Sequence, residues 1–267
     1  MTSGITHDRI YAAPKPRFVR VLGAPLHLLS LDEILETMER WIATRDVPRW
    51  IAVTGAHGIV ESNKSPEFKR ILESADLSIP DGRWTVWFAQ WRARSRMEQI
   101  RGADLLQRFC ETAAVKGYRV YFYGDTPEVL EALCARLRAL YPKLLIAGAY
   151  SPPFRDLTPG EEAEIRLRIV EARPDVLFAG LGLPKQERWI AGYREKLDIP
   201  VMVAIGAAFK FVSGLVKPAP RAVSAAGLEW LWRFLHEPRR CWRRVVVHCP
   251  WFLANCLLEI VGVKKYQ

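Results

Sequence analysis

The strongest constraint on the fold of this chain is a repeated alternation of short apolar runs with longer amphipathic stretches. Six runs are rich in Val, Ile, Leu or Phe and are bounded by Gly, Pro or Asp, as strands often are. They are residues 50–54, 77–79, 119–123, 144–147, 176–179 and 201–205. Helical stretches lie among them at residues 31–44, 66–74, 103–116, 126–141, 159–172 and 185–196. This alternation predicts an α/β fold: a Rossmann-like parallel sheet with helices on both faces.

Composition changes near residue 216 and divides the chain. We expect a flexible arm over residues 1–17, an α/β domain with the candidate catalytic residues over 18–215, and a helical, basic, membrane-associating appendage over 216–267. The net charge is +10, and from Lys217 onward nine Lys and Arg stand against three Glu. Such an excess favours an anionic partner, whether nucleic acid, a phosphate-bearing substrate or a membrane, although composition alone fits a merely basic protein equally well.

The chain has the features of a protein of the reducing cytosol. Its first residues contain no apolar core of a signal peptide, and its five cysteines show neither CxxC nor Cys/His metal spacing. The longest apolar stretch, Val245–Val263, is interrupted by His248, Pro250, Asn255 and Glu259. A spanning helix needs about 20 nearly uninterrupted apolar residues, so an interfacial or packed helix is the better interpretation.

Ligands of parallel sheets bind at the carboxyl ends of the strands, so the loops after the strands hold the candidate residues. Asp81, in the run Ile-Pro-Asp-Gly, is suited to act as a general base. A turn residue that caps the following helix is the alternative. Thr54 and His57, in Thr-Gly-Ala-His-Gly, could meet a ligand at a helix N-terminus, or form an ordinary turn with a structural histidine.

Two glycine-containing loops follow later strands. Gly124 precedes Asp-Thr-Pro, which opens a helix and could face a pyrophosphate, although neither GxGxxG nor a P-loop is present. The run Gly-Leu-Gly-Leu-Pro-Lys-Gln-Glu begins at Gly180. It gathers a cation, an amide and a carboxylate in one helical turn: Lys185, Gln186 and Glu187. This turn could bind a sugar or a phosphate, but helix capping alone explains it equally well.

The segment Gly227–Arg244 combines tryptophans with clustered arginines. Arg233, Arg240 and Arg244 recur near helical spacing, and Pro238 is expected to kink the helix. Arginine beside tryptophan suits a diphosphate at a membrane surface, while a solvated basic face is the alternative. The chain contains no DxD, HExxH or GxSxG run. A metal-bridged nucleotide-sugar site of the usual kind and a metal or serine hydrolase are therefore not indicated.

Taken together, these runs resemble the WecG/TagA/CpsF family, glycosyltransferase family 26. They follow the family's order from about residue 50 to residue 244. The runs that carry the resemblance are TGAHGIVES, ADLSIPDG, RGADLL, VYFYGDTPEVL, AGAYSPPF, LFAGLGLPKQERWI, AIGAAFKF and GLEWLWRFLHEPRRCWRR. The PDG, LGxPKQE and GLEWLxR…EPRR runs are the specific ones, and their combination is a strong signal.

The resemblance implies an enzyme that transfers a sugar from a UDP donor to a polyprenyl-diphosphate-linked saccharide in cell-surface or exopolysaccharide biosynthesis. The transfer is expected to invert the anomeric centre and to need no metal or other cofactor. The enzyme is expected to be cytoplasmic and peripheral, on the inner face of the cytoplasmic membrane. No nucleic acid partner is implied, and a homo-oligomer is left open.

The resemblance also assigns roles to residues. Asp81 is expected to be the catalytic base, and Thr54 and Gln186 to hold the donor or the reacting groups. A C-terminal set is expected to close over the diphosphates: Arg233, Arg240 and Arg243. Further residues are expected at the donor or its diphosphate: His57, Gly124, Gly182, Lys185, Glu187 and Gly206.

Two positions depart from the family pattern. Members commonly carry Asn where this chain has Ala56, and often Asp where it has Lys210. An N-acetylmannosamine donor is therefore not assumed, and a glucose- or glucuronate-type donor is equally open. Two other function classes are weighed: a nucleic-acid-binding module that uses the basic segment, for which no recognised motif is present, and a non-catalytic scaffold.

Overall fold

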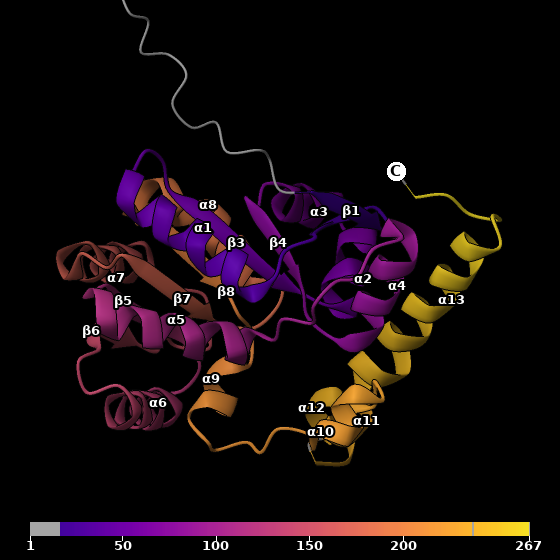
Figure 1. The fold of residues 1–267 in the computed structure, drawn as a ribbon. Coiled ribbons are helices and arrows are strands. Elements are labelled where there is room, and N and C mark those ends of the chain that lie inside the picture. The colour runs from indigo at the N-terminus through magenta and orange to yellow at the C-terminus, as the bar shows by residue number, and fades with distance from the viewer. Residues whose placement is uncertain (1–16, 237, 267) are drawn as a thin grey trace, which may run out of the picture.

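A six-stranded parallel sheet forms the centre of the protein (Figure 1). The computed structural model describes residues 17–236 and 238–266, with the side chains of 221, 225, 240, 241, 243 and 244 left out. The strand order is β4-β3-β8-β7-β5-β6, and every neighbouring pair is parallel. The strands are β3 (Arg49–Thr54), β4 (Leu77–Pro80), β5 (Arg119–Gly124), β6 (Leu145–Tyr150), β7 (Val176–Gly180) and β8 (Val201–Ala204). All six predicted strands are confirmed.

Helices cover both faces of this sheet, because its strands bury side chains on both sides. In β7, Val176 and Phe178 join one core while Leu177 and Ala179 join the other. The first core is covered by α1 (Leu31–Thr44), α5 (Gly102–Lys116), α6 (Pro127–Leu140) and α9 (Ala208–Val212). The second is covered by α2 (Ala56–Lys64), α3 (Pro66–Glu73), α4 (Arg83–Ala93), α7 (Pro159–Ala172) and α8 (Lys185–Leu197). The predicted fold class is confirmed.

Local capping signals define several helix starts. Ser30 and Glu33 form a capping box at α1, and Thr158 and Glu161 form another at α7. At α6, the Thr126 side chain accepts a hydrogen bond from the Val129 backbone N–H. These signals lie within one helical turn of sequence, which explains why the predicted starts of these helices are accurate to within one residue.

An antiparallel hairpin, β1 (Phe18–Val21) and β2 (Ala24–His27), precedes the sheet and was not predicted. It packs into the second core through Val21 and Leu26. His27 Nδ1 accepts a hydrogen bond from the Ser78 backbone N–H at 2.9 Å, which ties the hairpin to β4. The predicted arm over residues 1–17 lies, apart from Arg17, outside the described residues.

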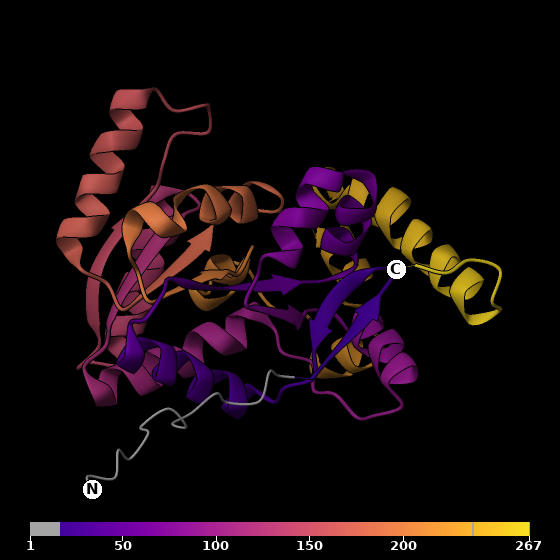
Figure 2. The same cartoon turned by 90° about the horizontal axis from the view of Figure 1, so that it is seen from above.

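The C-terminal segment is helical, as expected. It contains α10 (Arg221–Ala225), α11 (Glu229–His236), α12 (Pro238–Arg243), the π-helix η1 (Arg244–His248) and α13 (Cys249–Ile260). Residue 237, between α11 and α12, lies outside the described residues, so the kink expected at Pro238 stays a prediction. The last helix, α13, packs against α2 (Figure 2). It buries Phe252 and Cys256 in the second core. Within the described residues, no helix is both long enough and apolar enough to cross a membrane.

Candidate active site

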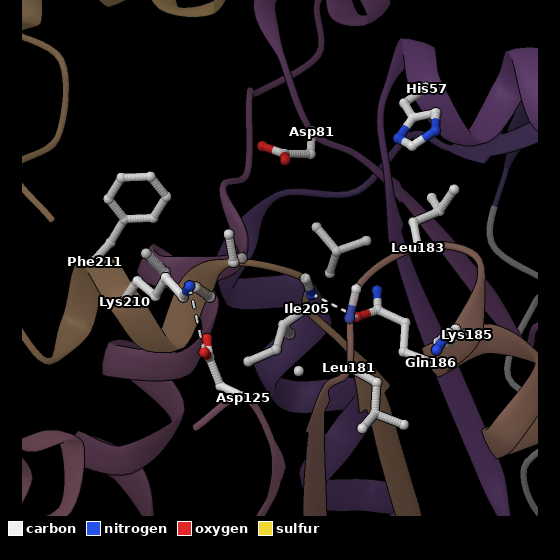
Figure 3. A pocket seen from close by; sticks show the side chains of 18 of the residues that line it. His57, Asp81, Asp125, Leu181, Leu183, Lys185, Gln186, Ile205, Lys210 and Phe211 are labelled. Carbon is white, nitrogen blue, oxygen red and sulfur yellow. Dashed lines mark hydrogen bonds and ion pairs between the residues drawn. The ribbon is translucent and has the colours of Figure 1, made fainter. Parts of the chain in front are cut away.

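A cavity of about 1560 Å³ opens at the carboxyl edge of the sheet. Its walls come from the loops that follow strands β3 to β8 and from the C-terminal segment. Figure 3 shows Asp81 and His57 on one side of this cavity, with the Lys210–Asp125 pair on the other. The cavity therefore lies where ligands bind in open parallel sheets, and it brings together loops that are far apart in the sequence.

Helix N-termini face this cavity. Helix α2 begins after Gly55 and α8 begins after Pro184, and neither N-cap residue makes a side-chain cap hydrogen bond. The first backbone N–H groups of such helices can bind an anion, because they point outward and carry the positive end of the helix dipole. The cavity is thus suited to a phosphate-bearing ligand.

Asp81 follows β4 directly and is half-buried at the cavity wall. Its backbone N–H donates to the Thr54 carbonyl oxygen at 2.8 Å. The two loops approach so closely that a Cβ on Gly55 would lie 2.5 Å from the Asp81 carbonyl oxygen. The N-cap of α4 is Gly82, with a φ of 95°, so Asp81 lies one residue before the cap position of this helix.

Thr54 lies behind the cavity wall rather than on it. Its side chain is only 1% exposed, and its hydroxyl has no hydrogen-bond partner among the described residues. A Cβ on Gly58 would lie 2.0 Å from this hydroxyl oxygen, so Gly58 keeps the space beside it open. A contact of Thr54 with a ligand stays a prediction. His57, one residue earlier than Gly58, does line the cavity.

Gln186 joins two of the loops that form the cavity. Its side-chain carbonyl oxygen accepts from the backbone N–H groups of Gly182 at 3.2 Å and Gly206 at 3.0 Å. Its amide donates to the Glu187 carboxylate at 2.9 Å. Glu187 is fully buried, and burial raises the pKa of its carboxyl to about 7. Gln186 thus positions the glycine loops, and the buried Glu187 carboxylate holds the Gln186 amide in place.

Of the remaining predicted loop residues, three line the cavity and one allows neighbouring loops to pack closely. Gly182, Lys185 and Gly206 line the cavity. Gly124, with a φ of 118°, instead allows close packing, because a Cβ there would lie 2.6 Å from the Gly180 carbonyl carbon. The donor-binding roles of all four residues stay predictions.

Lys210, where family members often carry Asp, has an ion-pair partner inside the cavity. The Lys210 ammonium lies 3.4 Å from the Asp125 carboxylate, and the side chains are 18% and 6% exposed. Asp125 directly follows β5 and has a φ of 54°. A cation and an anion thus neutralise each other at this wall.

Arg233 comes from the C-terminal segment and borders the same cavity as Asp81. Both also border an adjoining pocket of about 70 Å³. The Arg233 guanidinium lies over the Phe211 ring at 4.5 Å, and its Nε is 3.7 Å from the Glu229 carboxylate. The side chains of Arg240 and Arg243 lie outside the described residues.

Sequence reasoning missed several residues of the wall. Arg101, which donates to Asp104 at 2.8 Å, lies in the RGADLL run but was not singled out. The sequence signal that could have identified Arg101 is its place at the end of a polar loop, directly before a helix. Glu61 and His248 also reach the cavity, and no local pattern joins them, because they are brought together by the packing of α13 on α2.

Comparison with known proteins supports this picture. The model of the glycosyl transferase WecG/TagA/CpsF family matches residues 19–266. A protein of Bacillus spizizenii is 33% identical over 70% of both chains. A Bacillus subtilis protein is 26% identical over 89% of this chain and 90% of its own, and a Staphylococcus aureus protein is 26% identical over 85% and 86%. All three are named N-acetylglucosaminyldiphosphoundecaprenol N-acetyl-beta-D-mannosaminyltransferase.

The family match extends through the hairpin, the sheet, the cavity and the C-terminal helices. It therefore includes both the loops at the carboxyl edge and the segment that carries Arg233. This extent favours a transferase over a nucleic-acid-binding module or a scaffold. The chain belongs to the WecG/TagA/CpsF family of glycosyl transferases.

Proposed function

We propose that this protein transfers a sugar from a UDP-sugar to a saccharide linked to polyprenyl diphosphate, with inversion at the anomeric carbon. The observation that carries the proposal is the meeting of Asp81 and Arg233 at one cavity, among helix N-termini. These two side chains come from distant parts of the chain. In the cavity, the carboxylate can act at the sugar and the guanidinium at the diphosphate of one sugar-diphosphate.

In this reaction Asp81 accepts the proton of the acceptor hydroxyl as its oxygen bonds to the anomeric carbon. The bond from that carbon to the UDP oxygen breaks on the opposite face, so the configuration inverts. Gln186 keeps the glycine loops in place through its bonds to Gly182 and Gly206. Inversion requires the base and the leaving group to lie on opposite sides of the transferred sugar.

Negative charge develops on the departing diphosphate. Arg233 and the N–H groups at the starts of α2 and α8 are suited to stabilise it, because preorganised donors act strongly in a partly dry site. These groups supply positive charge without a metal ion at the reacting atoms. We accordingly propose that the transfer is metal-independent.

The names of the relatives describe an acceptor with N-acetylglucosamine on diphosphoundecaprenol. The direct test supplies this acceptor, or a shorter-chain lipid analogue, with a set of UDP-sugars, once with a chelator present and once without it. Product masses are then read. One UDP-sugar is expected to yield an acceptor longer by one sugar, together with UDP. No transfer from any UDP-sugar in the set would contradict the proposal.

A lipid-linked acceptor requires contact with a membrane, and we propose that α13 supplies part of this contact at the cytoplasmic face. One side of α13 packs on the protein, while the other side exposes apolar residues: Leu253, Leu257, Leu258 and Ile260, followed by Val261 and Val263. Lys264 and Lys265 follow this face. Apolar side chains with adjacent cations suit an interfacial helix on an anionic bilayer.

Replacement of Leu253, Leu257 and Ile260 by Ser is expected to weaken binding to anionic vesicles. Each apolar side chain kept from water contributes on the order of 1 kcal/mol, so the partition constant should fall at least about tenfold. Vesicle co-sedimentation measures this. Serine at Val115 and Leu167, which are exposed on α5 and α7, is the matched control. Equal loss in both variants would argue against this surface.

A further inference from the structure

Two histidines and a glutamate meet where α2 contacts the C-terminal segment. His57 and Glu61 lie one turn apart on α2, and His248 ends the π-helix η1. Glu61 Oε1 lies 3.4 Å from His248 Nε2 and 4.0 Å from His57 Nε2. The imidazole rings stack with centroids 4.3 Å apart, and one ligand atom of each residue lies within 4.8 Å of the others.

The arrangement fits the coordination of a small transition-metal ion. Zn²⁺ binds imidazole nitrogen and carboxylate oxygen at about 2.0–2.2 Å, which puts neighbouring tetrahedral ligand atoms roughly 3.4 Å apart. The separation of Glu61 from His248 already has this value. For both ring nitrogens to reach one ion, His57 must approach Glu61 by about half an ångström and turn out of its stack with His248. Such a shift is small for side chains that are 28% and 26% exposed.

We propose that His57, Glu61 and His248 form a binding site for Zn²⁺ or a similar divalent transition-metal ion. Imidazole ligands favour Zn²⁺, Cu²⁺ and Ni²⁺, whereas Mg²⁺ and Ca²⁺ prefer sites made of oxygen alone. Three protein ligands leave one position for water. The Lys64 ammonium, 3.6 Å from Glu61 and 44% exposed, turns into solvent when the ion binds.

The site connects two parts of the protein that are distant in sequence. His57 and Glu61 lie on α2, while His248 is the N-cap residue of α13. A bound ion therefore fastens the C-terminal segment, which carries Arg233, to the wall of the cavity. This role is separate from the transfer chemistry proposed above, which places no metal at the reacting atoms.

The test uses the full-length protein after removal of metals by a chelator. Titration calorimetry with Zn²⁺ and the visible absorption spectrum with Co²⁺ measure binding directly. We expect one ion per chain and a tetrahedral Co²⁺ spectrum. Single replacements His57→Ala, Glu61→Gln and His248→Ala should each weaken Zn²⁺ binding at least roughly 100-fold, since loss of an outer-shell partner alone costs roughly 10–100-fold.

His236→Ala is the matched control, because His236 is an exposed histidine of the same segment whose Nδ1 contacts the Trp232 carbonyl oxygen instead. It should bind Zn²⁺ like the wild type. Cys249→Ser tests whether the neighbouring thiol is the true ligand. The proposal would be overturned if the wild type did not bind Zn²⁺. It would also be overturned if each of the three single variants bound Zn²⁺ like the wild type, or if only Cys249→Ser lost binding.

A second set of measurements follows the stability of the C-terminal segment rather than the amount of bound ion. Amide hydrogen exchange over residues 245–260 should slow when Zn²⁺ is added to the wild type and remain unchanged in His248→Ala. The melting temperature should rise by about 5 °C or more at roughly 100 times the Kd, because the ion binds only the folded site. Exchange that ignores Zn²⁺ in the wild type would contradict a fastening role.

Discussion

Asp81→Asn is expected to lower kcat for sugar transfer by about 10²–10⁴-fold, the usual contribution of a general base. Asparagine keeps the size of the side chain but does not accept the proton of the acceptor hydroxyl. The backbone bond from residue 81 to Thr54 is unaffected by the change, so the fold should persist. KM should change little, because proton transfer belongs to the transition state.

Asp156→Asn is the control for this change. Asp156 is an exposed carboxylate on the loop after β6 and lines the same cavity. Its replacement should leave kcat within about threefold of the wild type, since Asp156 has no role in the proposed proton transfer. An Asp81→Asn protein with wild-type kcat and an unchanged melting temperature would remove Asp81 from the mechanism and leave the cavity without its proposed base.

Arg233→Ala is expected to reduce kcat by about 10²–10³-fold, because a positioned charge at the leaving group is lost. Arg233→Lys should recover only part of this rate. A lysine ammonium does not reproduce the planar fork that matches phosphate oxygens. Steady-state kinetics with the UDP-sugar found above measures both effects.

The control for Arg233 comes from the neighbouring helix. Arg239 is exposed on α12, and Arg239→Ala should have a small effect on kcat. Arg233 also packs on Phe211 and faces Glu229, so melting temperatures are compared alongside the rates. Full kcat in a folded Arg233→Ala protein would show that the diphosphate charge is stabilised elsewhere, and it would direct attention to the helix N-termini.

The fold was largely predictable because its signals are local. Each strand is a short apolar run between Gly, Pro or Asp, and each of the helices α1, α6 and α7 begins at a capping residue. The hairpin β1–β2 was missed because its strands have four residues each and include Pro25. Helix α4 was not delimited because its apolar residues are spread around the helix instead of along one face. Two of them, Trp87 and Trp91, are exposed.

The candidate site was predictable only in its parts. Asp81, His57, Gly182 and Gln186 were found because each follows an apolar run, and such runs end at one edge of a parallel sheet. Their roles toward a ligand stay predictions. The burial of Thr54 and Glu187 was not predictable, since a polar residue at the end of a strand or in the first turn of a helix gives no sign of whether it faces the cavity or lies behind it.

The sequence by itself determined the alternation of strands and helices, the chemistry of each loop and the family. The tertiary structure alone decided which loops meet. Lys210 reaches Asp125, and His248 reaches Glu61, because the strand order is β4-β3-β8-β7-β5-β6 and α13 packs back on α2. Contacts of this kind depend on the burial of apolar faces across the whole chain, and no local spacing of residues records that.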